Sequence, residues 1–177
     1  PDPNQSRQFV LFAAGSGITP VIAIIKEILE KEPLSQITLF YGNRSMRTVI
    51  FLEELENLKN RFIGRLSMHF IFSKELQSSP LFEGRITGER SAQMLKHFIH
   101  VKGNEQYYIC GPEEMIRDII HTLKESGVPE ERIHFELFTS PVGSLGTANE
   151  VIKDVETHAG ERAHVKVKLD GRIFAFD

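Results

Sequence analysis

Cysteine is almost missing from this chain of 177 residues. Cys110 is the single cysteine, so the chain alone cannot form an internal disulfide, a four-thiolate zinc site or a complete ferredoxin-type iron–sulfur cluster. Such sparing use of thiols is typical of a reducing compartment, and we expect a cytoplasmic location.

A large net charge and long apolar runs are also missing. The formal net charge of −3 excludes a general attraction to nucleic acid or to an anionic membrane, so a local cluster of basic residues must recognise any phosphate. No apolar run approaches the ~20 residues that a helix needs to cross a bilayer. The chain starts at Pro1 without an initiator methionine, and we expect it to be part of a longer protein.

Several catalytic and metal-binding motifs are incomplete. Ser16 lacks the flanking glycines of a nucleophile elbow, and the lysine motif of a phosphate loop does not occur. Arg117 lies one residue too far from Cys110 for the spacing of a phosphatase loop. His97 and His100 share one helix face without further metal ligands, so we expect no metal site there.

Apolar segments with strand and helix patterns alternate along most of the chain. The chain is 41% hydrophobic, enough for one well-packed domain with a small appendage. The predicted strands are Phe9–Ala13, Gln36–Tyr41, Leu66–Phe72, Gln106–Cys110 and Arg132–Leu137. The predicted helices are Pro20–Lys31, Thr48–Arg61, Glu89–Ile99 and Pro112–Ser126. This order predicts an α/β fold, with a doubly wound five-stranded parallel sheet and helices on both faces.

The composition changes after residue 138. Polar residues and glycines without a clear period predict a linker over residues 139–163. Beyond it, alternating apolar residues on both sides of Asp170-Gly171 predict a β-hairpin over residues 164–177. We therefore expect one main domain over residues 1–138, followed by the linker and the hairpin.

A glycine-rich turn follows the first predicted strand. Gly15 and Gly17 match the start of the dinucleotide fingerprint G-x-G-x-x-G, whereas Pro20 stands where the third glycine belongs. Pro20 suits the first turn of a helix, and Thr19 is the expected N-cap. A helix N-terminus after such a turn presents backbone N–H groups to an anion. These residues alone leave two interpretations open, a dinucleotide-phosphate site or a tight turn without a ligand.

Basic residues follow the second and third predicted strands. Dinucleotide-binding folds place either an acid for the ribose of NAD or a base for the 2′-phosphate of NADP after the second strand. Arg44 and Ser45 stand there, and no acid occurs from Tyr41 until Glu53. A guanidinium and a hydroxyl both suit phosphate oxygens. Lys74 and Arg85 follow the third strand. Their joint placement favours a phosphate site over unrelated surface cations.

Five segments in this order resemble the pyridine-nucleotide domain of ferredoxin-NADP reductase-like flavoproteins. They are Gly15–Pro20, Tyr41–Ser45, Phe82–Ile86, Tyr107–Met115 and Phe135–Phe138. The resemblance is greatest to reductases of the phenylacetyl-CoA epoxidase reductase and vanillate or phthalate reductase type, with a C-terminal [2Fe-2S] domain. It implies that residues 1–138 form an NAD(P)-binding domain and that the hairpin opens a truncated ferredoxin-like domain.

The resemblance also implies a function. NADPH would pass hydride to FAD, and electrons would then reach an iron–sulfur centre or an acceptor protein. A flavin-binding Arg-x-Tyr-Ser/Thr segment and the cluster cysteines are missing, so FAD and the [2Fe-2S] cluster are expected in the full-length protein and not on this chain. No nucleic-acid or membrane partner is expected. NADH as the coenzyme, and a nucleotide-sensing module without redox turnover, remain as alternatives.

The resemblance assigns roles to particular residues. Cys110 and Glu136 would be catalytic, close to the nicotinamide. The residues implied in cofactor binding are Gly15, Ser16, Gly17, Thr19, Pro20, Asn43, Arg44, Ser45, Lys74, Arg85, Gly111, Pro112, Glu113, Met115 and Phe138.

Overall fold

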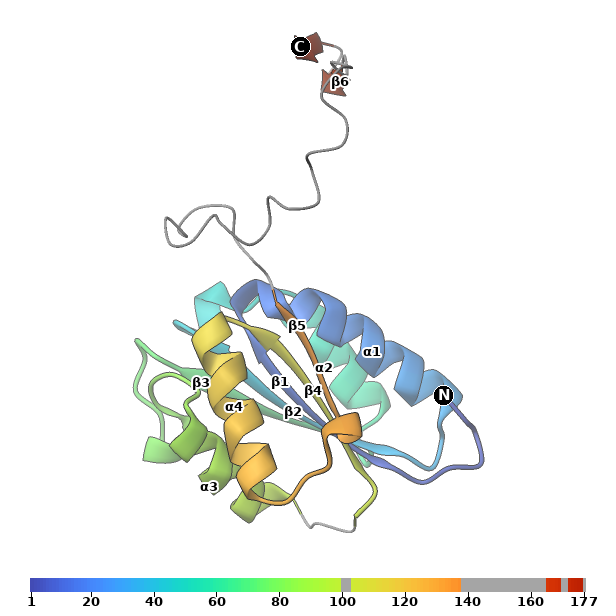
Figure 1. Ribbon diagram of the computed structural model, residues 1–177, viewed down its shortest axis with the longest axis vertical. Helices are drawn as coiled ribbons and strands as arrows, with labels where there is room; N and C mark the ends of the chain where they lie inside the picture. The colour runs from blue at the N-terminus through green and yellow to red at the C-terminus, as the bar shows by residue number, and fades with distance from the viewer. Residues whose placement is uncertain (100–102, 138–164, 170–171, 177) are drawn as a thin grey trace, which may run out of the picture. The chain divides into compact units, whose positions relative to one another are not determined.

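The computed structural model describes residues 1–99, 103–137, 165–169, 172–176 and divides the chain into two units, Pro1–Thr139 and Ser140–Asp177 (Figure 1). The first unit holds a five-stranded parallel sheet with the order β3-β2-β1-β4-β5. Its strands are β1 (Gln8–Ala14), β2 (Gln36–Asn43), β3 (Leu66–Phe72), β4 (Glu105–Gly111) and β5 (Ile133–Leu137). The predicted sheet is confirmed.

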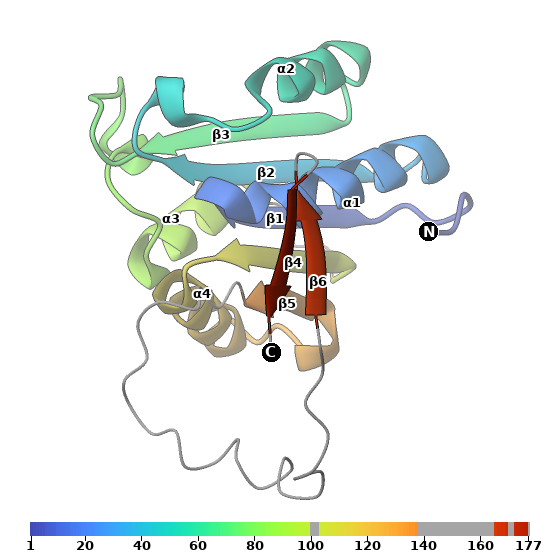
Figure 2. The ribbon, with the colours of Figure 1, turned by 90° about the horizontal axis from the view of Figure 1, so that it is seen from above.

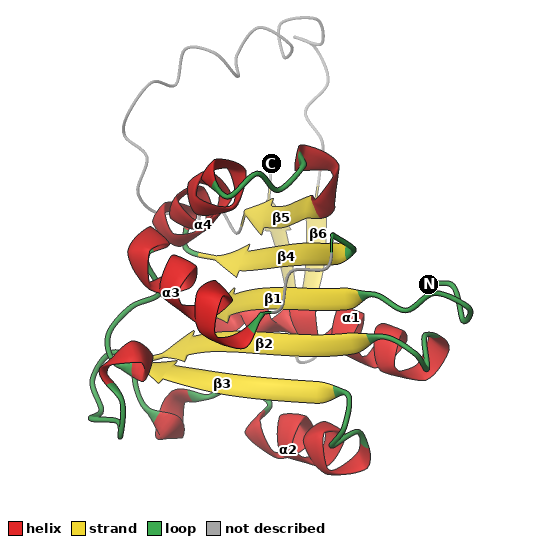
Figure 3. Ribbon diagram, turned by 90° about the horizontal axis from the view of Figure 1, so that it is seen from below, coloured by secondary structure: helices red, strands yellow, loops and turns green. Residues whose placement is uncertain are grey.

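Four helices cover the two faces of the sheet. They are α1 (Ile18–Lys31), α2 (Leu52–Arg61), α3 (Gly88–Phe98) and α4 (Glu113–Glu125). Short 3-10 turns are η1 (Gly15–Gly17), η2 (Met46–Thr48), η3 (Pro80–Phe82) and η4 (Glu130–Arg132). Seen from opposite sides, α1 lies in front of the sheet in Figure 2, whereas α3 and α4 lie in front of it in Figure 3. The fold is therefore doubly wound, as predicted.

Each face of the sheet has its own apolar core. Along β1, Leu11 packs into the core beneath α1 and α2, while Phe12 packs into the core beneath α3 and α4. Both side chains are fully buried. Because successive strand residues point to opposite faces, a central strand covered on both sides must be apolar throughout. This explains the unbroken apolar run of the first strand.

The second helix starts later than its sequence pattern predicts. The predicted helix over residues 48–61 is wrong in its first turn, because Phe51 has a left-handed backbone with φ of 59°. The chain forms η2 first, where Ser45 N donates to Thr48 Oγ1 at 3.2 Å, and α2 begins at Leu52. Ile50 and Phe51 are 40% exposed and do not join the buried helix face.

A buried carboxylate holds the segment that leads into β1. Glu32, next to the end of α1, is fully buried and accepts hydrogen bonds from the Arg7 guanidinium and from Ser35 Oγ, the latter at 2.8 Å. Burial raises the pKa of Glu32, but these hydrogen bonds outweigh burial and leave the pKa below its usual value. The network lies at the amino ends of the strands, away from the predicted site.

The second unit contains the predicted hairpin strands. β6 (Val165–Leu169) pairs antiparallel with β7 (Arg172–Phe176), and Leu169 lies opposite Arg172. The predicted linker, residues 139–163, lies outside the described residues. Among the helices that the structure describes, none combines the length and the apolarity that crossing a bilayer requires.

Candidate nucleotide-binding site

The loops that carry the predicted site residues lie at one edge of the sheet. All five strands run parallel, so their carboxyl ends meet there, as the arrowheads in Figure 3 show. The loops are Gly15–Gly17 after β1, the residues around Arg44 after β2, Ser73 and Lys74 after β3, and Pro112 after β4. Parallel α/β sheets bind ligands at this edge.

The glycine turn after β1 needs both of its glycines. Gly15 has a φ of +54°, which favours a residue without a Cβ. Gly17 lies against the end of β4, where a Cβ would stand 2.2 Å from the carbonyl oxygen of Cys110. The turn therefore lies directly on β4, and α1 starts from that position at Ile18.

The expected N-cap role of Thr19 is wrong. Helix α1 begins two residues earlier than predicted, at Ile18, with Gly17 as the N-cap and no side-chain cap. Thr19 Oγ1 instead donates to the carbonyl oxygen of Ser16 at 2.9 Å. Pro20 lies within the first turn of the helix, where a missing N–H costs little because that N–H has no partner within the helix.

Tyr41 contacts the glycine turn, although its place in the sequence did not mark it as a site residue. Its Oη donates to the carbonyl oxygen of Gly15 at 2.9 Å. Tyr41 is fully buried on β2, and burial raises the pKa of its hydroxyl. The sequence feature that could have marked Tyr41 is its place inside an apolar strand, because a buried tyrosine hydroxyl needs a hydrogen-bond partner.

Backbone hydrogen bonds bring the two basic loops together. Ser73 N donates to the Asn43 oxygen at 2.9 Å, and Lys74 N donates to the Arg44 oxygen at 2.8 Å. The pairing of β2 and β3 thus continues into the loops, and Arg44 and Lys74 are neighbours with exposed side chains. The Asn43 Nδ2 atom is buried and makes no hydrogen bond of normal geometry among the described residues, and the Asn43 side chain lies close enough to the Tyr41 hydroxyl to lower the pKa of that hydroxyl, against the larger effect of burial. A buried unsatisfied donor at a ligand-binding edge is a candidate ligand contact.

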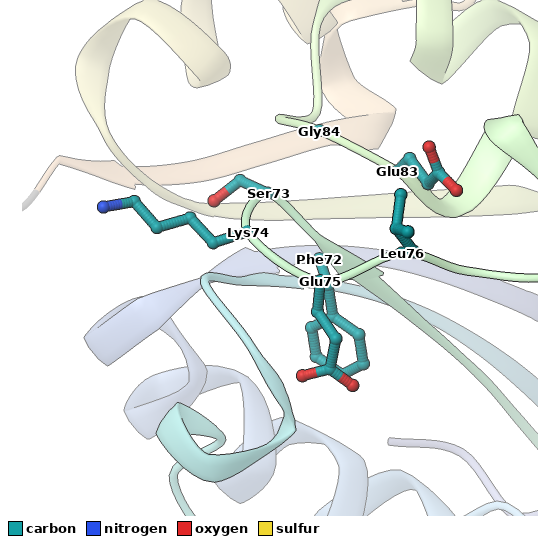
Figure 4. Close-up of a pocket in the computed structure, with 7 residues that line it drawn as sticks. All are labelled: Phe72, Ser73, Lys74, Glu75, Leu76, Glu83 and Gly84. Carbon is teal, nitrogen blue, oxygen red and sulfur yellow. The ribbon is translucent and has the colours of Figure 1, made fainter.

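A pocket of about 280 Å³ opens beside the third strand (Figure 4). Its lining residues are Phe72, Ser73, Lys74, Glu75, Leu76, Glu83 and Gly84. Both carboxylates accept backbone hydrogen bonds: Glu75 accepts from Met46 N at 3.0 Å, and Glu83 from Gln77 N at 2.9 Å. Arg85 follows the pocket directly and is exposed. One cation, Lys74, and two carboxylates therefore line this pocket.

The end of β4 places the two predicted catalytic residues opposite each other. Cys110 and Glu136 are register partners on β4 and β5. Cys110 is 2% exposed, and burial together with the charge of Glu136 raises the pKa of its thiol. Glu136 is exposed. The thiol is therefore protonated and behaves as a small apolar group rather than as a nucleophile.

The start of α4 is packed as closely as the glycine turn. A Cβ on Gly111 would stand 2.5 Å from Cε of Met115, and Met115 is buried beneath it. Pro112 is the N-cap of α4, and Glu113 is exposed in its first turn. Phe138, the remaining predicted contact, lies outside the described residues.

A family model identifies this arrangement. Residues 11–121 match the model described as the oxidoreductase NAD-binding domain. The chain belongs to that family. The match runs from β1 into α4, so this NAD-binding domain includes the glycine turn, both basic loops and the end of β4. The predicted resemblance to ferredoxin-NADP reductase-like proteins is confirmed.

Two relatives of this NAD-binding domain are components of oxygenating enzyme systems. The first belongs to the 1,2-phenylacetyl-CoA epoxidase of Escherichia coli K12 and is 38% identical over 172 residues, 97% of this chain and 46% of the relative. The second is the ferredoxin reductase component of the 3-ketosteroid-9-alpha-monooxygenase of Rhodococcus rhodochrous. It is 31% identical over 166 residues, 93% of this chain and 44% of the relative. The chain thus spans less than half the length of each.

A solved structure shares the fold. The CS-b5R domains of human Ncb5or, solved in an NAD+ form, superpose with a TM-score of 0.64 at 25% identity and cover 73% of this chain and 36% of that one.

Proposed function

We propose that this chain is the NADP(H)-binding part of a flavin-dependent reductase. The observation that carries the proposal is the glycine turn, in which Gly15 has a left-handed backbone and Gly17 lies against the Cys110 carbonyl, within an NAD-binding family match. Such a turn leaves room for a dinucleotide phosphate at the start of a helix. The dinucleotide, when bound, supplies hydride for FAD, from which electrons pass to an iron–sulfur centre or an acceptor protein. The ferredoxin reductase name of the Rhodococcus relative favours this function over a sensing module.

The backbone of the turn is proposed to bind the pyrophosphate. Gly15, Ser16 and Gly17 would contribute N–H groups, while Thr19 and Pro20 shape the first turn of α1. Thr19 supports this role because its hydroxyl already binds the Ser16 carbonyl. Because the Thr19 hydroxyl occupies the Ser16 carbonyl oxygen, the turn presents N–H donors, rather than a free carbonyl acceptor, to an anion.

The paired loops after β2 and β3 are proposed to bind the adenosine side. Arg44, Ser45, Lys74 and Arg85 would contact the 2′-phosphate, and the buried Nδ2 of Asn43 would donate to the ligand. The support is the backbone link between Arg44 and Lys74. Two cations held side by side suit the double negative charge of a phosphate monoester.

The end of β4 is proposed to contact the nicotinamide. Cys110, Gly111, Pro112, Glu113 and Met115 would form this end of the site, with Glu136 and Phe138 from the last strand. The protonated thiol of Cys110 suits an apolar wall beside the nicotinamide. Hydride transfer itself needs no proton donor on this wall.

NADH is a second candidate coenzyme, and one observation favours it. Glu75 and Glu83 line the pocket beside Lys74. A carboxylate accepts hydrogen bonds from ribose hydroxyls and repels a phosphate, and this is how dinucleotide folds select NAD. The three cations Arg44, Lys74 and Arg85 favour NADPH, whereas these two carboxylates favour NADH.

Titration calorimetry of this chain with 2′-phospho-AMP and with AMP tests the 2′-phosphate site. We expect 2′-phospho-AMP to bind at least ~10-fold more tightly, and Arg44→Ala to remove most of that preference. Arg117→Ala is the control, because Arg117 is an exposed arginine on α4. Equal affinities in the unaltered chain would reject the 2′-phosphate assignment and leave NADH.

The other cofactors are proposed for the full-length protein. One buried cysteine does not fit a [2Fe-2S] cluster, which takes four thiolates in ferredoxins. We propose that residues 1–138 form the NAD(P)-binding domain, residues 139–163 a linker and residues 164–177 the start of the cluster domain. The match to the E. coli relative over 97% of this chain supports continuation beyond the first unit. The free cysteine supports a cytoplasmic location.

A further inference from the structure

Tyr41 connects the core of the sheet to the glycine turn. Its ring packs in the core beneath α1, with the Phe70 ring at a centroid distance of 6.1 Å. Its Oη donates to the Gly15 oxygen at 2.9 Å, across 26 residues of sequence. The strand thus fixes one atom of a turn that contains two glycines.

The bonded carbonyl determines how the next peptide group faces. No peptide bond among the described residues is cis, and in a planar trans peptide the C=O and N–H groups point in opposite directions. When Tyr41 holds the Gly15 oxygen toward the core, the Ser16 N–H must face the other way, out of the core. The backbone N–H of Ile18 also donates to the Gly15 oxygen, so the Tyr41 hydroxyl adds a second hydrogen bond to this carbonyl. The second bond further restricts rotation of a peptide group that follows a glycine.

We propose that Tyr41 is a positioning residue for the pyrophosphate of the dinucleotide. Its hydroxyl holds the Gly15 carbonyl inward and so keeps the Ser16 N–H directed at the anion. The inference rests on the proposed dinucleotide binding and adds to it a buried residue that does not touch the ligand. Because burial raises the pKa of the hydroxyl, Tyr41 remains a hydrogen-bond donor throughout the neutral pH range.

The substitution Tyr41→Phe tests this role, since it removes one hydroxyl and keeps the ring. The readout is the affinity for two probes, NADP+ and adenosine 2′-monophosphate, measured by calorimetry. Only NADP+ carries a pyrophosphate. We expect NADP+ to bind roughly 5- to 10-fold more weakly, as for the loss of one hydrogen bond that orients a donor. Adenosine 2′-monophosphate should keep its affinity within about twofold.

Two further variants separate positioning from a general loss of structure. Tyr107→Phe removes another buried tyrosine hydroxyl, from β4 and in the opposite core, and should leave both affinities unchanged. Gly15→Ala disturbs the same turn through its backbone, because alanine disfavours the left-handed conformation of this residue. A Cβ at this position meets no atom within 4 Å, so no steric clash contributes. This variant should reproduce the selective loss even if Tyr41→Phe does not fold.

Three outcomes would overturn the inference. Unchanged NADP+ affinity in Tyr41→Phe would show that the hydroxyl does not matter for binding. Equal weakening of both probes would show a general structural effect. Failure of the unaltered chain to bind NADP+ would instead reject the proposed function, and the inference with it.

Discussion

Gly17 is the position where one added methyl group should do most harm. A Cβ there would stand 2.2 Å from the Cys110 oxygen, 2.6 Å from the Cys110 carbonyl carbon and 3.0 Å from the Gly111 nitrogen. The first distance is about 1 Å or more inside ordinary non-bonded contact. All three atoms are backbone atoms of β4 and its end, so no side chain can rotate away to relieve the clash.

Gly17→Ala should therefore separate the start of α1 from the end of β4. Overpacking of a tightly packed site costs about 1–3 kcal/mol, and we expect a loss of unfolding free energy in the upper half of that range because the obstacle is backbone. NADP+ affinity should fall as well, since the shift moves the turn proposed to hold the pyrophosphate. Urea unfolding and calorimetry measure the two effects.

Gly64→Ala is the matched control. A Cβ on Gly64 would meet no atom within 4 Å, and its φ lies outside the left-handed region. Its effect on unfolding should stay within about 0.5 kcal/mol. If Gly17→Ala were as stable as Gly64→Ala and bound NADP+ equally well, the close approach of the turn to β4 would be refuted.

Three further predictions concern residues away from the turn. Glu32→Ala should lower the unfolding free energy by about 2–4 kcal/mol in urea titrations, because it leaves the Arg7 guanidinium partly buried without its carboxylate. Glu32→Gln should cost less, and equal costs would argue against a role for the charge. His69, stacked on Phe82 with 5.7 Å between ring centroids, has a pKa below 6.5, lowered by burial and then by Lys59. Its stabilising contribution is therefore full above pH 6.5 and declines as the pH falls below that value. His69→Phe should flatten the dependence of unfolding free energy on pH between about 5 and 7, and an unchanged slope would contradict this. In the full-length reductase, Cys110→Ala should slow hydride transfer roughly tenfold while coenzyme binding changes less; an unchanged rate in stopped-flow measurements would reduce Cys110 to a packing role.

The sheet and its helices were predictable because burial on both faces leaves a clear pattern. Every strand of the parallel sheet appears where the apolar runs predict it, and β1 shows why: Leu11 and Phe12 enter opposite cores. Strand ends then place Gly15 and Arg44 at one edge by topology alone. The location of the site therefore follows from the fold class.

The errors have local causes that periodicity does not express. Phe51 takes a left-handed backbone that its apolar spacing conceals, and the helix starts after it. Thr19 has the chemistry of an N-cap, but the chain enters the helix at Gly17, so the hydroxyl turns back to Ser16. In both cases, the geometry of the preceding turn overrides the preference of the residue.

Long-range polar contacts could not be predicted from the sequence for a different reason. The bond from Tyr41 to Gly15 joins residues 26 positions apart, and that from Met46 to Glu75 joins residues 29 apart. Neither spacing is periodic, so only the paired strands show which residues meet. The roles of the individual site residues remain predictions.

Amide resonances test most directly whether a dinucleotide binds at the carboxyl ends of the strands. Titration of the isotope-labelled chain with NADP+ should shift the signals of Gly15, Ser16 and Gly17 and those of Arg44 and Lys74. The amide signal of Ser35, in the Glu32 network at the opposite edge, should not move. Shifts confined to that opposite edge, or no shifts at saturating NADP+, would contradict binding at the carboxyl ends.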